Sequence, residues 1–94
     1  MDPLQEIEKY LKQFDYKTYY TNSRTTLTDQ QKKDITTNIL NWSLIDALKY
    51  LDSFEIHHRI VSWNNKSFIC TDDIVFNRIN LTVDNYTIID AQFY

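Results

Sequence analysis

The 94-residue chain contains no glycine, and it has only one proline and one cysteine. Average proteins carry about 7% glycine, so the absence excludes every motif that depends on this residue. Glycine-rich phosphate loops, dinucleotide-binding fingerprints and the nucleophile elbow of α/β-hydrolases all use glycine where the backbone turns sharply or approaches a ligand. We therefore expect neither a nucleotide-dependent enzyme nor an α/β-hydrolase.

The charge balance and the single cysteine exclude further classes of protein. Ten Lys and Arg stand against thirteen Asp and Glu, a formal net charge of −3, whereas nucleic-acid-binding domains are usually basic. Cys70 has no second cysteine to pair with, so the fold does not need an oxidising compartment. No apolar run reaches the roughly 18–20 residues that span a bilayer, and the start at Met1–Glu6 lacks the features of a secretory signal. We expect a cytoplasmic protein with neither nucleic acid nor membrane as partner.

The composition also indicates a source. Phe, Tyr, Met, Ile, Asn and Lys make up 39 of the 94 residues, whereas Gly, Ala, Arg and Pro make up 6. This bias is typical of an AT-rich genome, such as that of a phage, a large DNA virus, a low-GC bacterium or a protist. For a viral protein, the expected compartment is the host cytoplasm.

The N-terminus carries a helix signal. Asp2 followed by Pro3 predicts an N-cap and a first helical residue. Apolar residues then recur at helical spacing from Leu4 to Phe14, which predicts a helix over 3–14.

Two further helices are predicted in the middle of the chain. Thr28 and Gln31 form a capping-box pattern that predicts a helix over 29–40. Ser43, with Asp46 three residues later, predicts that a new helix begins there.

The second half of the chain changes to a period of two, which is typical of strands. Strands are expected at 55–61, 78–84 and 87–93. A short apolar run at 68–70 precedes an irregular segment at 71–77. Because Asn tolerates positive φ, we expect residues such as Asn65, Lys66 and Asn85 to form the turns that glycine usually forms.

The order of helix, strand, irregular loop, strand, turn and short strand over residues 42–94 resembles the potato inhibitor I family of serine-protease inhibitors. The family's helix opens with a Ser cap followed by acid and Ala, as in Ser43–Ala47, and its reactive loop and returning strand fit Ile69–Asp84 without a gap. The resemblance implies an α+β fold, in which N-terminal helices accompany a helix packed on a small mixed β-sheet with an exposed loop between parallel strands. We expect one domain over 1–94, with 1–41 as a helical extension and 42–94 as the inhibitor-like core.

The resemblance also implies roles for individual residues. Asp72 would occupy the scissile-bond position, which suits a protease with a basic specificity pocket, with Thr71 before it and Asp73 after it. Arg78 would be the strand arginine whose guanidinium holds the loop extended, and Asn80 stands where the family has a second supporting arginine. The partner-binding loop would thus consist of Thr71, Asp72, Asp73, Ile74, Val75 and Phe76, supported by Arg78 and Asn80.

Other candidate sites have simpler explanations. Adjacent strand residues such as His57 and His58 point to opposite faces, so they cannot complete one metal site. Cys70 lies within an apolar run and fits a small core residue better than a nucleophile. Asp72 and Asp73 have no third acid nearby in sequence to complete a cation site. We expect no metal, no cofactor and no enzymatic activity, since a nucleophile, a base and an oxyanion donor cannot be assembled from this chain.

The leading hypothesis is a non-catalytic binding protein that presents residues 71–77 to a protein partner, with inhibition of a serine protease as its concrete form. The alternative is a phage or viral antagonist of a host protein or defence system, which would bind through its N-terminal helices and the Tyr-rich segment. Tyr16, Tyr19 and Tyr20 suit such an interface, but they suit covering the core equally well. The sequence leaves homo-oligomerisation open.

Overall fold

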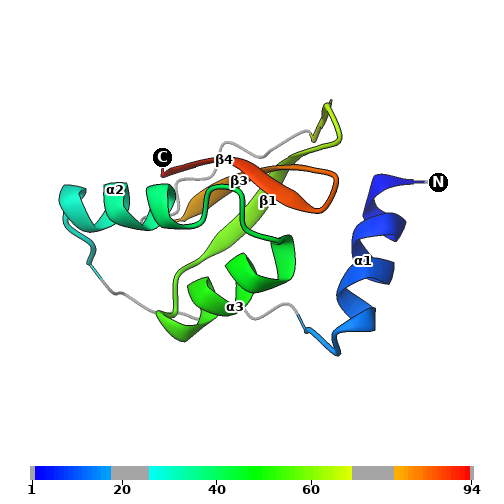
Figure 1. Ribbon diagram of the computed structural model, residues 1–94, viewed down its shortest axis with the longest axis horizontal. Helices are drawn as coiled ribbons and strands as arrows, with labels where there is room; N and C mark the ends of the chain where they lie inside the picture. Colours follow the sequence, from blue (N-terminus) through cyan, green and yellow to red (C-terminus); the bar gives the residue numbers. More distant parts are fainter. Residues whose placement is uncertain (1, 18–25, 69–77, 94) are drawn as a thin grey trace.

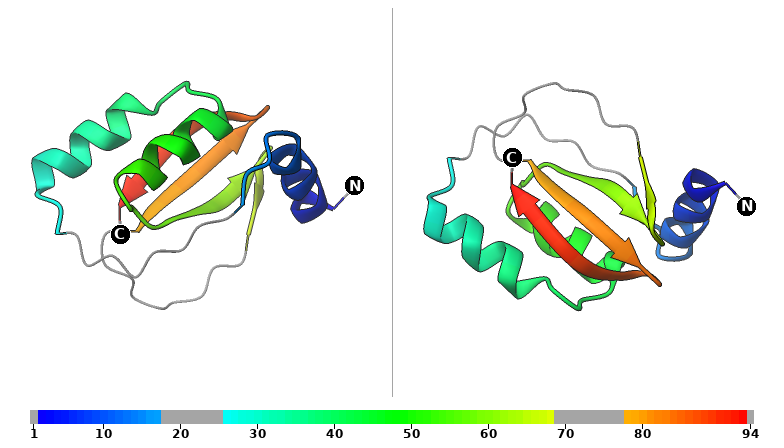
Figure 2. Two further views of the ribbon diagram at one scale, coloured as in Figure 1. Left: turned by 90° about the horizontal axis from the view of Figure 1, so that it is seen from below. Right: turned by 90° about the horizontal axis from the view of Figure 1, so that it is seen from above.

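Three helices and a four-stranded mixed sheet make up the chain in the computed structural model, which describes residues 2–17, 26–68 and 78–93 (Figure 1). The elements are α1 (Pro3–Gln13), α2 (Asp29–Asn38), α3 (Leu44–Ser53), β1 (His58–Trp63), β2 (Lys66–Ser67), β3 (Ile79–Asp84) and β4 (Thr87–Phe93). The expected α+β class is confirmed. Helices α1 and α2 lie at opposite ends of the molecule, and α3 lies across one face of the sheet (Figures 1 and 2).

The sheet has the strand order β2-β1-β3-β4, so β3 is a central strand. It pairs in parallel with β1, with His58 opposite Ile79, and antiparallel with β4, with Ile79 opposite Phe93. Parallel strands were expected on either side of residues 71–77, but the strand that comes directly before them is β2, which runs antiparallel to β1; the parallel pair is β1 and β3. The β2 strand extends the sheet as a two-residue hairpin partner of β1, which the sequence pattern did not predict.

The helix starts follow the expected caps. Asp2 accepts a hydrogen bond from the backbone N–H of Leu4 at 3.0 Å. Thr28 and Gln31 form the reciprocal capping box at the start of α2. At α3 the hydroxyl of Ser43 accepts from the N–H of Asp46 at 3.3 Å, which confirms that a new helix begins after Ser43.

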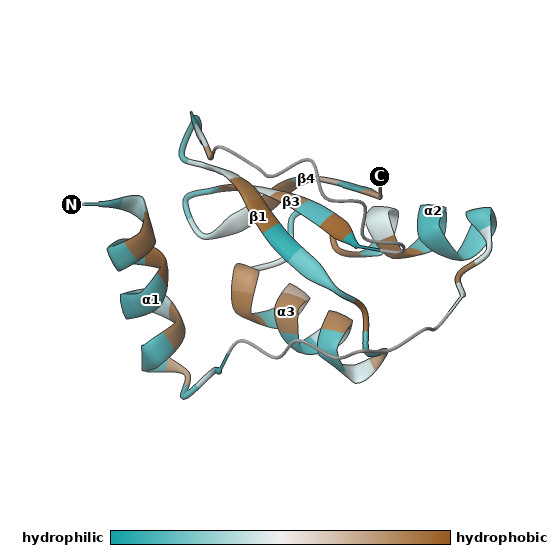
Figure 3. Ribbon diagram, turned by 180° about the vertical axis from the view of Figure 1, so that it is seen from behind, coloured by the Kyte–Doolittle hydropathy of each residue, from teal (hydrophilic) through white to brown (hydrophobic). Residues whose placement is uncertain are grey.

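One core joins α2, α3 and the sheet. The helix-covered face of the sheet carries Leu81 and Ile88, and both side chains are fully buried. Helix α2 adds Ile35 and Ile39 to the same apolar cluster, so much of the expected N-terminal extension shares the core of residues 42–94. Helix α1 differs because it contributes no buried residue, and Leu4 in its first turn is 58% exposed. The side of α1 turned toward the rest of the molecule is nonetheless largely apolar (Figure 3).

Asparagine occupies tight-turn positions where glycine is usually found. Both hairpins have two-residue loops in which each residue has a positive φ, which is typical of a type I′ turn. The β1–β2 loop consists of Asn64 and Asn65, and the β3–β4 loop consists of Asn85 and Tyr86. Lys66, expected as a turn residue, lies instead in β2. In the described ranges, the non-glycine residues with positive φ are Asp15, Asn41, Glu55, Asn64, Asn65, Asn85 and Tyr86.

The segment expected as a strand at 55–61 begins three residues late because its first residues end α3. Glu55 has a φ of 57°, and the N–H of Ile56 bonds back to the carbonyl of Leu51 at 3.0 Å. Such a left-handed residue after a helix satisfies carbonyls of its last turn. The strand then runs to Trp63, two residues beyond the expected end. At α2 the helix ends at Asn38 rather than at residue 40.

Substitutions in the turn at residues 64–65 test whether asparagine at positive φ costs stability. Replacing Asn65 by Gly should raise the free energy of unfolding by about 0.5–1 kcal/mol, because glycine adopts positive φ without the clash of a Cβ atom. Urea unfolding followed by far-UV circular dichroism measures the change.

The matched control is Asn64→Gly in the same turn. The side-chain oxygen of Asn64 accepts a hydrogen bond from the N–H of Asn85 at 2.8 Å and so joins the two hairpin loops. We expect its loss to cancel the conformational gain. A stabilisation of the Asn64→Gly variant equal to that of Asn65→Gly would contradict this interpretation.

Candidate functional site

The expected binding loop lies outside the described residues, whereas its two support residues lie within them. Thr71, Asp72, Asp73, Ile74, Val75 and Phe76 fall outside them, as do Tyr19, Tyr20 and Cys70. The structure describes the support residues Arg78 and Asn80, the third tyrosine Tyr16, and both ends of the connection that contains the loop.

Both ends of this connection are fixed to the sheet. On the outgoing side, the N–H of Phe68 donates to the carbonyl of Val61 at 2.9 Å, which continues the β1–β2 hairpin. On the returning side, the N–H of Ile79 donates to the carbonyl of His57 at 2.8 Å, at the start of the parallel pairing. Residues 69–77 are therefore bracketed by two segments hydrogen-bonded to the same strand, β1.

Asn80 forms a polar link across three strands. Its neighbours Ile79 and Leu81 are fully buried in the core, so Asn80 points to the opposite face of the sheet from α3. Its side-chain oxygen accepts from Nε of Arg59 on β1, and its amide nitrogen donates to the carbonyl of Gln92 on β4 at 3.2 Å. Asn80 is only 2% exposed, so these two bonds satisfy a polar group that would otherwise be costly to bury.

Arg59 was missed by the sequence analysis. It lies directly opposite Asn80 in the parallel register, so the two side chains share one row of the sheet. Strand alternation alone places Arg59 on this face, but its pairing with Asn80 depends on the register of β1 against β3. Arg78 is half-buried immediately before β3, and alternation places it on the same face as Asn80. Its role in holding the loop stays a prediction.

Tyr16, which follows α1 in the chain, belongs to a polar cluster with Asp52 and His58. Its hydroxyl donates to Oδ2 of Asp52 at 2.6 Å and lies 3.3 Å from Nε2 of His58. The other carboxylate oxygen of Asp52 lies 3.1 Å from the same nitrogen. A carboxylate can only accept, so this contact places the proton of a neutral His58 on Nε2. The cluster connects the end of α3, the start of β1 and the chain after α1, and Tyr16 packs against the core.

His58 is held mainly in its neutral form. Its side chain is only 6% exposed, and this burial lowers its pKa below the ordinary 6.5, although the hydrogen bond and charge of Asp52 act in the opposite direction. His57, the next residue, is half-buried. The two histidines thus differ as the strand alternation predicts, with His58 packed against the helix side of the sheet.

A second polar cluster connects α1 to the far end of the sheet. The carboxylate of Glu6 accepts hydrogen bonds from Nε1 of Trp63 and from the hydroxyl of Tyr86, both at 3.1 Å. The ring of Tyr10 stacks on that of Tyr86, with ring centres 4.6 Å apart, and its hydroxyl accepts from the N–H of Ile45 at 3.3 Å. Because α1 buries no residue completely, these contacts supply much of what holds it to the sheet. The hydrogen bond to Glu6 raises the pKa of the Tyr86 phenol above 10.0.

The part of the chain that the structure describes has neither a metal-binding cluster nor a membrane-spanning helix. No group of three His, Cys, Asp or Glu side chains there is placed to hold a metal ion. None of the helices there is long and apolar enough to cross a bilayer.

No protein-family model, curated protein or solved structure matches the chain. The geometry of its own residues therefore has to support any functional proposal.

The burial of His58 predicts a pH dependence of stability. Because the pKa of His58 is lower in the folded chain than in the unfolded one, the unfolded chain binds more protons below about pH 6.5. Stability should therefore fall as the pH decreases from 6.5 toward the folded-state pKa of His58. Urea midpoints measured from pH 5 to 7.5 follow this change.

The His58→Gln variant should lose this contribution to the pH dependence, whereas His57→Gln should keep it. Equal slopes in the wild type and the His58→Gln variant would show that His58 is not the titrating group.

The Glu6 cluster predicts the effect of removing its carboxylate. Glu6→Ala leaves the buried N–H of Trp63 without its acceptor, which should lower the free energy of unfolding by about 1–3 kcal/mol. Glu6→Gln keeps an acceptor but removes the charge, so the phenol pKa of Tyr86 should shift down toward 10.0.

Urea unfolding measures the first effect, and absorbance at 295 nm across alkaline pH measures the second. Glu8→Gln, at an exposed position of the same helix, is the control and should change neither quantity. A Tyr86 titration that is the same in wild type and Glu6→Gln would contradict the assigned bond.

Proposed function

We propose that this chain is a non-catalytic protein-binding module that presents residues 71–77 to a protein partner, and that the partner is a serine protease with a basic specificity pocket. The supporting observation is the parallel pairing of β1 with β3, with both ends of the connecting segment hydrogen-bonded to β1. A segment anchored in this way loses less conformational freedom on binding, which favours affinity.

The arrangement around the connection also supports the potato inhibitor I likeness. Helix α3 opens with Ser43 as its cap, the strand after it pairs in parallel with the strand after the loop, and β4 returns antiparallel through a two-residue turn. The family resemblance implies this order. It leaves Asp72 as the proposed residue for the protease's specificity pocket.

The polar row on the face of the sheet opposite α3 supports the proposal further. Arg59 and Asn80 connect β1 to β3 beside the place where the chain returns from the loop, and Gln92 extends the link to β4. A sheet cross-linked at this row keeps Arg78 at a defined position. A planar guanidinium there can bond several carbonyl or carboxylate oxygens of a loop at once.

Residues 1–40 contribute to the core, so deleting them does not test the proposal. Deleting residues 1–40 would remove Ile35 and Ile39, whose side chains are in the core, so a truncated chain would lose binding merely by unfolding. Point variants in the loop avoid this difficulty.

The test is inhibition of a serine protease that cleaves after acidic residues. The wild-type chain should inhibit it, and Asp72→Ala should weaken inhibition by at least about tenfold, as for a contact residue at the centre of an interface. Ile74→Ala should weaken it as well. Asp84→Ala, which removes an exposed carboxylate at the end of β3, is the matched control and should inhibit as the wild type does.

Circular dichroism melts verify that each variant is folded. If the wild type does not inhibit, the partner is not a serine protease of this specificity; if Asp72→Ala and Ile74→Ala inhibit as strongly as the wild type, the loop is not the binding element. Affinity purification with the same variants extends the test to partners other than proteases.

A further inference from the structure

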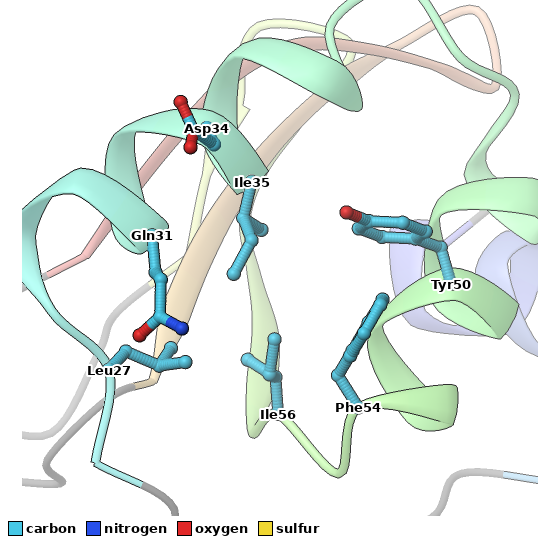
Figure 4. Close-up of a pocket in the computed structure, with 7 residues that line it drawn as sticks. All are labelled: Leu27, Gln31, Asp34, Ile35, Tyr50, Phe54 and Ile56. Atoms are coloured by element: carbon cyan, nitrogen blue, oxygen red, sulfur yellow. The ribbon is translucent and has the colours of Figure 1, made fainter.

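A groove lies between α2 and α3. Its cavity of about 270 Å³ is open at the surface and is lined mostly by apolar side chains (Figure 4). We call it the α2–α3 groove, and its lining residues are Leu27, Gln31, Asp34, Ile35, Tyr50, Phe54 and Ile56. Ile35 and Ile56 form its buried base, where they are 8% and 4% exposed.

The aromatic rings of Tyr50 and Phe54 line one wall of the groove, and Trp42 lies outside the lining but packs against Tyr50. The ring of Trp42 packs edge-on against Tyr50 with centres 5.2 Å apart, and Tyr50 packs in the same way against Phe54 at 5.0 Å. Tyr50 and Phe54 are four residues apart, so both lie on one face of α3 and its end. Phe54 is 53% exposed, which leaves a large apolar ring in contact with water at the mouth of the groove.

The walls are held in place independently of any ligand. The capping box of Thr28 and Gln31 fixes the start of α2, and Ser43 caps α3. The bond from the Ile56 N–H to the Leu51 carbonyl fixes the turn that carries Phe54. A preformed groove between two helices is one of the common ways to bind an amphipathic helix through its apolar face.

The negative charge of Asp34 at the groove favours a helix that carries a basic residue. Among the described residues, Asp34 is the only charged one that lines it, and its carboxylate accepts a hydrogen bond from the neutral amide of Gln30 at 2.9 Å. No Lys or Arg of the described residues pairs with Asp34, and the chain carries a net charge of −3. A basic residue on the incoming helix would complement this carboxylate.

We propose that the α2–α3 groove is a second binding surface, which accepts an amphipathic helix of a partner protein carrying a large apolar side chain and a neighbouring Lys or Arg. The apolar side chain would cover Phe54 and fill the space above Ile35 and Ile56. The basic residue would pair with Asp34. The proposal rests on described residues that play no part in the argument for the loop, so its test is separate from the test of the loop.

The probe is a labelled 14-residue amphipathic peptide with Leu at helical spacing and Lys at the other positions, compared with the same peptide carrying Glu in place of Lys. Fluorescence anisotropy should show binding of the Leu/Lys peptide and none of the Leu/Glu peptide. Phe54→Ala should weaken binding by about tenfold or more, as for a hot-spot aromatic. Asp34→Asn should weaken it by about threefold or more and reduce its dependence on salt.

The matched controls lie on α1, at the opposite end of the molecule (Figure 1). Leu4→Ala removes an equally exposed apolar side chain, and Glu8→Gln removes an exposed carboxylate. Both should bind the peptide as the wild type does. Binding that is unchanged by Phe54→Ala, equal for the Leu/Lys and Leu/Glu peptides, or absent for the Leu/Lys peptide would overturn the proposal.

The molar mass of the chain in solution distinguishes a second copy from a partner protein. Helix α1 is itself amphipathic, with Leu4 and Phe14 exposed. Light scattering should show a monomer at the concentrations used for binding. A dimer that is lost in both Phe54→Ala and Leu4→Ala would show that α1 of a second copy occupies the groove, and it would overturn the assignment to a partner protein.

Discussion

The parallel pairing of β1 with β3 is the interaction on which the rest of the structure depends. It makes β3 a central strand, with Ile79, Leu81 and Val83 fully buried against the helix side. It also brings together two parts of the chain that are separated by residues 64–78, because parallel neighbours cannot be joined by a tight turn. The closure of that long segment costs conformational entropy, which the apolar contacts of β3 with α3 offset.

Buried polar contacts fix how the outer elements join this sheet. Glu6 connects α1 to Trp63 and Tyr86, the cluster of Asp52 and His58 connects α3 to β1, and Asn80 connects β1 to β4. Such contacts add less stability than apolar burial, but a wrong arrangement would leave their donors and acceptors without partners. They therefore select one position for each element that the apolar core alone would hold less specifically.

The two proposed binding surfaces differ in their physical basis. For residues 71–77 the basis is anchoring, because the sheet restrains both ends of the segment. For the α2–α3 groove the basis is exposed apolar area beside a carboxylate that no Lys or Arg of the described residues pairs with, and Phe54 and Asp34 are its defining residues. Capped helices and a shared core hold the walls of the groove, and strand pairing holds the residues that flank the loop.

Local signals in the sequence determined where α1, α2 and α3 begin and where the strands at 79–84 and 87–93 lie. They also determined the use of Asn in place of Gly at tight turns. Caps, period-two alternation and positive φ depend on neighbouring residues alone, so the sequence pattern is enough to predict them. The late start of β1 was not predictable, since Glu55 and Ile56 have a strand-like pattern yet end a helix. The pairs Arg59–Asn80 and Asp52–His58, the contact of Glu6 with Trp63, and the groove containing Phe54 were decided only by the tertiary structure. Each joins residues from different elements, and strand register and helix packing bring those residues together through contacts that no local pattern encodes.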